Sequence, residues 1–391
     1  MEFPVTSESA SVGLLEQLVG FPTVSRDSNL ALISFVADYL RGFGIASELF
    51  HNKERTKANL FATIGPGDRG GIVLSGHTDV VPVDGQNWSV DPFRLTRRDG
   101  RLYGRGTADM KGFIASVLAT VPALAREDLA VPVHLAFSYD EEIGCVGVGS
   151  LLEELQTRAN KPRLCLIGEP SELRPILGHK GKIAARCRVR GFACHSAHSP
   201  SGVNAIEYAA RLIAQLGRIG ERLAQPGLRD TRFDPPFSTV QTGLIKGGTA
   251  LNIVPAECEF DFEVRAVPGF DPERVVAELR DHAATEVEPR MRAVQADTGV
   301  SVDVVASYPA LATDAHSEAA RLLADWSGSA EFGTVAFGSE GGLYDRAGIP
   351  AVVCGPGSMD QGHKPDEFIT VDQLARCDAM LARLARYLRH A

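Results

Sequence analysis

Acidic residues and histidines stand at five places where an apolar run ends or a glycine-rich turn occurs. Long stretches of chain separate these positions, so only folding can bring them together. Carboxylate and imidazole side chains are the ligands that borderline divalent ions such as zinc or cobalt prefer. The pattern therefore predicts one metal site assembled by the fold, with these ligands: His77, Asp109, Glu142, Glu169 and His363.

Five ligands are too many for one tetrahedral ion. Two ions about 3.5–4 Å apart that share one carboxylate would use all five, and they would lower the pKa of a water between them toward roughly 7. That arrangement is typical of a metal-dependent hydrolase. The seven cysteines contain no C-x-x-C pair, which argues against a structural cysteine site.

The elements that must position these residues alternate between apolar runs and helical stretches. The apolar runs end at residues 74, 139, 167, 337 and 354, and the helical stretches span 12–19, 29–43, 110–125, 147–156, 317–326 and 371–387. Apolar strands separated by helices predict an α/β fold, a doubly wound and mostly parallel sheet covered on both faces. In such sheets ligands gather beyond the carboxyl ends of the strands. The residues expected to share that edge are His77, Glu141, Glu142 and Glu169.

The middle third of the chain has a different pattern. Alternating segments at 183–189, 240–245, 258–264 and 300–305 are interspersed with helical segments at 202–216 and 271–284. This strand-helix-strand-strand-helix-strand order is that of a ferredoxin-like α+β unit. We therefore expect two domains, as the length of 391 residues also suggests. The catalytic domain would span 1–179 and 308–391, and 180–307 would form an inserted lid and dimerisation domain.

Composition and charge exclude several kinds of partner. The net charge of −9 and the pI of 5.6 argue against nucleic acid and anionic membranes, which attract clustered Lys and Arg. No run reaches the roughly 20 apolar residues needed to span a bilayer, and the N-terminus shows no secretory signal pattern. Seven cysteines, mostly in apolar runs, suggest free thiols in a reducing compartment. We expect a cytoplasmic protein with a small-molecule substrate.

Five stretches of the chain carry a resemblance to a known family. They are residues 75–85, 104–112, 166–171, 247–252 and 354–367. Through them the chain resembles, nearly end to end, the dinuclear-zinc M20 aminoacylase and deacylase family. The resemblance implies two Zn²⁺ per subunit, with Co²⁺ as a substitute, and a homodimer formed through the inserted domain.

The resemblance also assigns the ligands by motif. Asp109 would bridge the two ions. His77 and Glu169 would hold one ion, and Glu142 and His363 the other.

Two residues beside the ligands receive supporting roles from the same resemblance. Asp79, two residues after His77, would orient the His77 imidazole. Glu141, next to the ligand Glu142, would be the general base that takes a proton from water and later delivers it to the leaving amine.

Four residues are assigned to the substrate. His195 would come from the partner subunit's lid and donate a hydrogen bond to the oxyanion, although a histidine directly before Ser196 is also a candidate helix cap. Asn252 and Arg265 would contact the substrate's carbonyl and carboxylate. Glu340 would meet a substrate ammonium group.

The activity implied by the resemblance is removal of an acyl group from the α-nitrogen of an amino acid. Residues 178–182 and 354–367 favour the branch that releases acetate from N2-acetyl-L-ornithine, a step of arginine biosynthesis. Succinyl-diaminopimelate, general N-acyl amino acids and dipeptides stay alternatives, because the size of the pocket decides among them. The alternative of another class is a non-catalytic, metal-bound amino-acid-binding protein.

Overall fold

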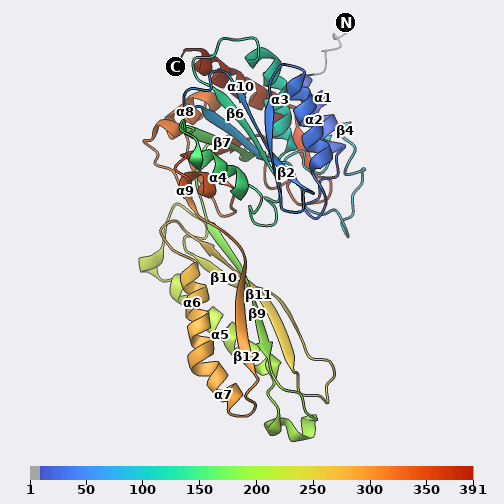
Figure 1. Ribbon diagram of the computed structural model, residues 1–391, viewed down its shortest axis with the longest axis vertical. Coiled ribbons are helices and arrows are strands. Elements are labelled where there is room, and N and C mark those ends of the chain that lie inside the picture. The colour runs from blue at the N-terminus through green and yellow to red at the C-terminus, as the bar shows by residue number, and fades with distance from the viewer. Residues whose placement is uncertain (1–8, 391) are drawn as a thin grey trace. The chain divides into compact units, whose positions relative to one another are not determined.

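The computed structural model describes residues 9–390, which form two compact units (Figure 1). One unit takes in the chain up to Gly178, Leu311–Thr334 and the chain from Ser339 onward, and the other takes in His179–Ala310 and Val335–Gly338. The predicted boundaries fell after residue 179 and before residue 308. Unlike in that prediction, residues 335–338 also join the second unit, where Gly338 lies against the ring of Tyr308 with no room for a side chain. Residues 1–8, on which the prediction of no secretory signal depends, lie outside the described residues.

The first unit is built on a mixed nine-stranded sheet. Its strands are β1 (Ser47–His51), β2 (Ala58–Ile64), β3 (Ile72–His77), β6 (Val133–Ser138), β7 (Leu164–Pro170), β8 (Ile176–His179), β13 (Leu311–Ala312), β14 (Gly333–Val335) and β15 (Ala351–Gly355). Their order is β1-β2-β6-β3-β7-β15-β8-β13, and β14 pairs with β8. The four central strands, β6, β3, β7 and β15, run parallel to one another. Every residue in them is buried, which explains why they read as continuous apolar runs.

Helices cover both faces of this sheet. They are α1 (Ala10–Val19), α2 (Leu30–Arg41), α3 (Lys111–Leu124), α4 (Gly149–Thr157), α8 (Glu318–Ser327), α9 (Gly341–Arg346) and α10 (Val371–His390). Leu74 of β3 belongs to the core formed with α1, α2, α3, α8 and α10. Its neighbour Ser75 points to the opposite face, where it contacts Tyr344 of α9. The predicted doubly wound, mostly parallel α/β fold is thus confirmed.

A small antiparallel sheet of the first unit was not predicted. It contains β4 (Thr96–Arg98), β5 (Arg101–Tyr103) and β16 (Phe368–Thr370), in the order β16-β5-β4. This sheet matters because the turn that carries Asp109 follows β5, and the loop that carries His363 precedes β16. Two segments far apart in the chain are therefore joined beside the expected metal ligands.

The second unit has the predicted ferredoxin-like order of elements. Its main elements are β9 (Gly181–Arg190), α5 (Ala205–Leu223), β10 (Thr239–Gly247), β11 (Glu257–Ala266), α6 (Glu273–His282) and β12 (Gly299–Tyr308). The shorter helices are η1 (Ser196–Ser201), η2 (Pro226–Leu228), η3 (Ala283–Val287) and α7 (Glu288–Arg292). The four strands are antiparallel in the order β10-β11-β9-β12. Alternate residues such as Ile183 and Phe262 form a core with α5 and α6, which is why these strands alternate in sequence.

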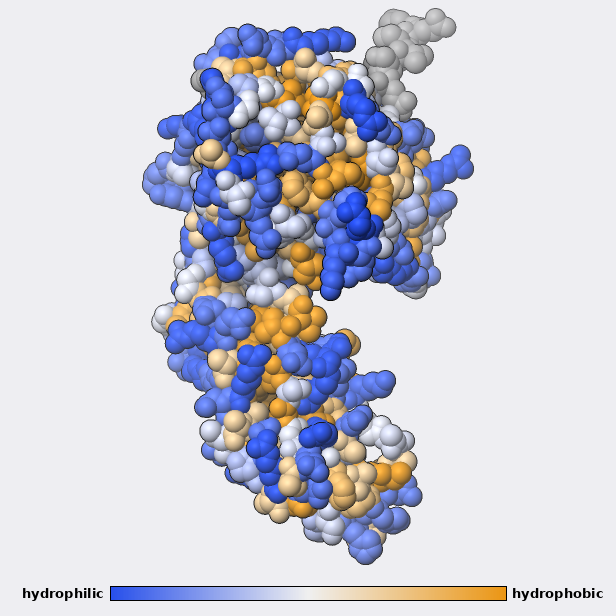
Figure 2. All heavy atoms as spheres, viewed as in Figure 1, coloured by the Kyte–Doolittle hydropathy of each residue, from blue (hydrophilic) through white to orange (hydrophobic). Residues whose placement is uncertain are grey.

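Surface and cysteine properties agree with the composition. The face drawn in Figure 2 is largely hydrophilic, with apolar residues interspersed. Within residues 9–390, no helix combines the length and apolarity needed to cross a lipid bilayer. All seven cysteines fall in the described range and are free thiols, six of them buried and Cys194 partly exposed.

Candidate metal centre

The five predicted ligands converge in the first unit. His77 is the last residue of β3, Glu169 is the last but one of β7, and Glu142 follows the end of β6. His363 lies in the loop after β15, with a left-handed backbone at φ 62°. Asp109 comes from a different direction, in the turn between β5 of the small sheet and the start of α3.

Asp109 lies between the two imidazoles and turns one carboxylate oxygen toward each. Its Oδ1 is 3.0 Å from Nε2 of His77, and its Oδ2 is 3.1 Å from Nε2 of His363. Oε1 of Glu169 is 3.5 Å from Nε2 of His77, and Oε2 of Glu142 is 3.0 Å from Nε2 of His363. Each imidazole thus has a carboxylate of its own and shares Asp109.

These separations fit two ions that share Asp109. Bonds of about 2.0–2.2 Å at a tetrahedral angle place two ligand atoms of one zinc ion roughly 3.3–3.6 Å apart, close to the 3.0–3.5 Å found here. Oε1 of Glu142 is buried and has no hydrogen-bond partner within residues 9–390, as an oxygen that faces an ion would be. The ligand atoms of His77, Asp109 and Glu142 lie within 4.8 Å of one another, as do those of His77, Glu141 and Glu169.

Crowding of buried acidic groups sets the electrostatics of the centre. Burial and the charges of Glu142 and Asp109 raise the pKa of Glu141 to about 8, against the opposing effect of His77. Burial and Asp109 likewise raise the pKa of Glu142 to about 7. Burial disfavours the charged form of His77, but Glu169 and Asp109 outweigh it and raise the pKa of the imidazole well above its usual value. A site with more carboxylates than cations favours the binding of divalent cations.

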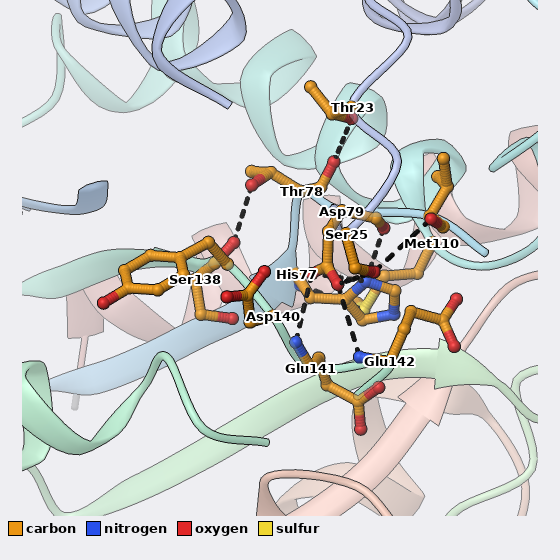
Figure 3. Close-up of polar contacts among 12 residues, drawn as sticks. Thr23, Ser25, His77, Thr78, Asp79, Met110, Ser138, Asp140, Glu141 and Glu142 are labelled. Atoms are coloured by element: carbon orange, nitrogen blue, oxygen red, sulfur yellow. Dashed lines mark hydrogen bonds and ion pairs between the residues drawn. The ribbon is translucent and has the colours of Figure 1, made fainter. Parts of the chain in front are cut away.

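Asp79 holds the segment that carries Glu141 and Glu142 (Figure 3). Its Oδ1 accepts a hydrogen bond from the amide of Glu141 at 3.1 Å, and its Oδ2 accepts from the amide of Glu142 at 3.3 Å and from the Ser25 hydroxyl at 2.7 Å. The Asp79 carboxylate thereby positions the backbone of both glutamates.

The orientation of the His77 imidazole depends on the backbone carbonyl of Asp79. Nδ1 of His77 donates to the carbonyl oxygen of Asp79 at 2.9 Å, while Oδ1 of Asp79 is 3.6 Å from that nitrogen. Because a carbonyl oxygen only accepts, Nδ1 carries a proton, and Nε2 is the nitrogen that faces Asp109 and would be the one to bind an ion.

Glu340 lies against the face of β3 to which Ser75 points, and 2% of its surface is exposed. Its Oε2 accepts the hydroxyl of Ser75 at 3.2 Å, and the Tyr344 hydroxyl lies 3.2 Å from the same Ser75 oxygen. Burial raises the pKa of Glu340 to about 7. Its contact with a substrate ammonium group stays a prediction.

His195 and Asn252 lie together in the second unit. The amide of Ser196 donates to the carbonyl oxygen of Asn252 at 3.0 Å, and His195 pairs with Ile253 in an isolated bridge. Nδ1 of His195 accepts the amide of Ala197 at 3.1 Å, so this histidine does cap η1. The cap leaves its other ring nitrogen for a further contact, which the structure does not test.

Arg265 lies apart from these two residues. It is near the far end of β11, where it donates to the Tyr308 hydroxyl at 3.0 Å and pairs with Glu263 at 3.2 Å. At about 3.3 Å per residue, the strand from residue 257 to residue 265 spans roughly 25 Å. The three residues predicted to contact substrate through the lid are therefore not brought together within one chain's second unit.

Sequence reasoning missed three residues next to the centre. Arg105 and Glu367 form a buried ion pair at 2.6 Å, and the thiol of Cys145 donates to Oε1 of Glu141 at 3.2 Å. The sequence offered one sign of this role, the charged side chain of Arg105 between two glycines in a stretch that otherwise indicated a turn.

Comparison with known proteins identifies the family. The sequence model of peptidase family M20/M25/M40 matches residues 73–387 of this chain. The chain is 38% identical to an acetylornithine deacetylase of Myxococcus xanthus over 94% of this chain and 95% of that protein. It is 32% identical to an acetylornithine deacetylase of Pasteurella multocida, again over 94% of this chain and 95% of the relative.

Solved structures share the fold at low sequence identity. An M20 family metallo-carboxypeptidase of Sulfolobus solfataricus matches with a TM-score of 0.77 and 18% identity, over 98% of this chain and 100% of that one. A di-peptidase of Saccharomyces cerevisiae matches with a TM-score of 0.74 and 15% identity, over 97% and 96% of the two chains. The protein belongs to the M20/M25/M40 family of metal-dependent hydrolases.

The buried acidic cluster predicts how pH affects the protein stripped of metal. Glu141 and Glu142 reach pKa values of about 8 and about 7 from 4.5, and hydrogen bonds to Asp109 and Glu142 raise the pKa of His363 from 6.5 to about 10. A group whose pKa is higher in the folded than in the unfolded state makes its full contribution to stability below its unfolded pKa. This contribution is lost as the pH rises through its folded pKa. Urea unfolding of chelator-treated protein should therefore show a free energy of unfolding that falls between roughly pH 4.5 and pH 10.

Two comparisons sharpen this test. Glu141→Gln removes one of the titrating groups, so its decline with pH should be shallower, and saturation with Zn²⁺ should flatten the decline in the unsubstituted protein. Stability of the stripped protein that is level or rises over this range would contradict the account.

Proposed function

We propose that this protein is a two-zinc deacylase that hydrolyses N2-acetyl-L-ornithine to L-ornithine and acetate in arginine biosynthesis, with Co²⁺ able to replace Zn²⁺. The observation that carries the proposal is the carboxylate of Asp109, whose two oxygens lie 3.0 and 3.1 Å from two different imidazoles. The choice of substrate is supported by full-length relatives named for acetylornithine deacetylation. Cytoplasmic location stays a prediction.

The chain's own residues divide naturally between two ions. His77 and Glu169 would hold one ion, Glu142 and His363 would hold the other, and Asp109 would bridge them. Bound ions of this kind polarise an amide carbonyl and make a water acidic enough to lose a proton near neutral pH.

Glu141 would move the proton in this proposal. It adjoins the ligand Glu142, and its carboxylate lies near that of Glu169. In the proposed reaction Glu141 takes a proton from water, and the water oxygen bonds to the carbonyl carbon. As the carbon–nitrogen bond breaks, Glu141 returns the proton to the amine nitrogen, so acetate and a free α-amine leave. The Cys145 thiol, which donates to Oε1 of Glu141, would fix which oxygen accepts the proton.

Substrate contacts from the second unit would require two copies of the chain. His195 and Asn252 lie in loops beyond the Glu257 end of β11, and Arg265 lies near its other end. The stretch from residue 257 to residue 265 is roughly 25 Å long, farther than an acetylated amino acid extends. If all three contact one substrate, as the family resemblance implies, then His195 and Asn252 come from one subunit and Arg265 from the other. Glu340, in the first unit, would face the substrate's ammonium group.

An exposed edge strand supports a homodimer through the second unit. β10 is the edge of its sheet, and Leu244 and Ile245 on it are 67% and 56% exposed. Leu251 and Ile253, in the loop that follows, are 103% and 41% exposed. A second copy paired along β10 would cover these apolar side chains and the free edge.

Glu141→Gln should abolish turnover without loss of metal. The amide keeps the size of the side chain but cannot accept the proton, so kcat should fall by at least about a hundredfold. Metal content by elemental analysis should match that of the unsubstituted protein. A variant that keeps most of its kcat would show that Glu141 is not the base.

A substrate panel tests the specific reaction. When release of the free amine is measured, N2-acetyl-L-ornithine should have a higher kcat/KM than N-succinyl-diaminopimelate and N-acetylmethionine. Equal or faster turnover of a competitor would reassign the substrate within the family. Metal binding with no amidase activity on any of them would favour the binding-protein alternative.

Hybrid dimers test the contribution of the partner subunit. His195→Ala and Glu141→Gln should each be inactive, but a hybrid dimer has one site that combines an intact Glu141 with an intact His195 from the other chain. Random exchange of equal amounts should therefore restore about a quarter of the original activity, since half of the dimers are hybrids with one good site. If mixing restores nothing although exchange is shown by mass spectrometry of the dimers, His195 does not act across the interface.

A further inference from the structure

Arg105 and Glu367 form a buried ion pair beside the proposed metal centre. Each side chain is 1% exposed, and Nη1 of Arg105 lies 2.6 Å from Oε2 of Glu367. Desolvation makes a buried ion pair weak as a source of stability, so a role in fixing geometry deserves a test. Each residue also lies within four positions of a proposed ligand, Asp109 or His363.

Glu367 holds the backbone that presents Asp109. Its Oε1 accepts hydrogen bonds from two consecutive amides, those of Ala108 at 2.9 Å and Asp109 at 3.1 Å. Two bonds to adjacent amides fix the rotation of the intervening peptide. This rotation decides whether the Asp109 side chain can turn one oxygen to each imidazole.

Arg105 holds the backbone that presents His363. Its Nη1 donates to the carbonyl of Lys364 at 3.3 Å, and its Nη2 donates to Oε1 of Gln86 at 2.6 Å. Nε2 of Gln86 in turn donates to the carbonyl of His363 at 3.0 Å. The His363 side chain is 46% exposed and lies outside any strand, so it has little packing of its own to place it.

The pair therefore joins the two segments whose ligands must face each other. Glu367 positions the backbone of Asp109. Arg105 and Gln86 together position the backbone around His363, and the ion pair links the two sets of contacts. By contrast, His77 and Glu169 lie at the ends of the neighbouring parallel strands β3 and β7, two residues beyond the last ladder pair Ser75–Ile167, so the sheet itself places them close together.

We propose that Arg105 and Glu367 are positioning residues for the ion between Asp109, Glu142 and His363. Loss of the pair should weaken this ion's site most. The site held by His77 and Glu169 should weaken less, because it shares only Asp109 with the contacts of the pair. The proposal rests on the two-ion site of the proposed function and adds to it the device that sets one of the two affinities.

The test is a zinc titration of the full-length, chelator-stripped protein against a chromophoric competitor. The unsubstituted protein should show two binding steps, and His363→Ala identifies which step belongs to the site in question. Glu367→Gln should weaken that same step by about 10–100-fold, the usual effect of losing a residue that orients a ligand. The other step, which shares Asp109 but neither His363 nor Glu142, should weaken severalfold less. Thermal melting of each protein checks that it is folded.

Two further variants keep the test decisive. Gln86→Glu still accepts from Arg105 but no longer donates to the His363 carbonyl, so it should weaken the same step while leaving the buried pair intact. Glu318→Gln removes the half-exposed pair with Arg163 and serves as the control, with both steps unchanged.

The outcomes separate this inference from the proposed function. If Glu367→Gln and Gln86→Glu weaken both steps equally, or change neither, the positioning role is wrong while the two-ion site stands. If the unsubstituted protein binds no zinc in two stoichiometric steps, the proposed two-ion site is itself wrong and the pair has no such site to position.

Discussion

The central constraint on this structure is the crowding of buried carboxylates around two imidazoles. Asp109 and Glu169 are 3% and 4% exposed, and Glu141 and Glu142 lie against them with raised pKa values. Like charges at this spacing repel strongly when water is excluded. Divalent cations would relieve the repulsion, so bound metal would complete this region and at the same time equip it for hydrolysis.

Two buried acidic residues stabilise this crowded arrangement in the same way. Asp79 accepts the consecutive amides of Glu141 and Glu142, and Glu367 accepts the consecutive amides of Ala108 and Asp109. In both cases a carboxylate accepts hydrogen bonds from the backbone of a segment that carries proposed ligands, which leaves the proposed ligand side chains available to bind ions. His77 and Glu169 instead lie two residues beyond the last ladder pair of the parallel strands β3 and β7, so the sheet places them.

Much of this organisation could be predicted from the sequence, and the two exceptions are features that leave no readable periodic pattern. Apolar runs and strand ends placed His77, Glu142 and Glu169 at one edge, since the rule for parallel sheets acts on local pattern. The small sheet that brings Asp109 beside His363 was missed because its strands are only three residues long. The partnership of Arg105 with Glu367 was missed because no periodicity encodes a side-chain pair so distant in sequence.

Diffraction at the zinc absorption edge from crystals of the protein grown with Zn²⁺ would test the central claim most directly. Two anomalous peaks are expected, one on each side of Asp109 and each about 2.0–2.2 Å from one of its oxygens. One peak should also contact His77 and Glu169, and the other Glu142 and His363. Peaks elsewhere, or a single ion that leaves either imidazole without a contact, would contradict it.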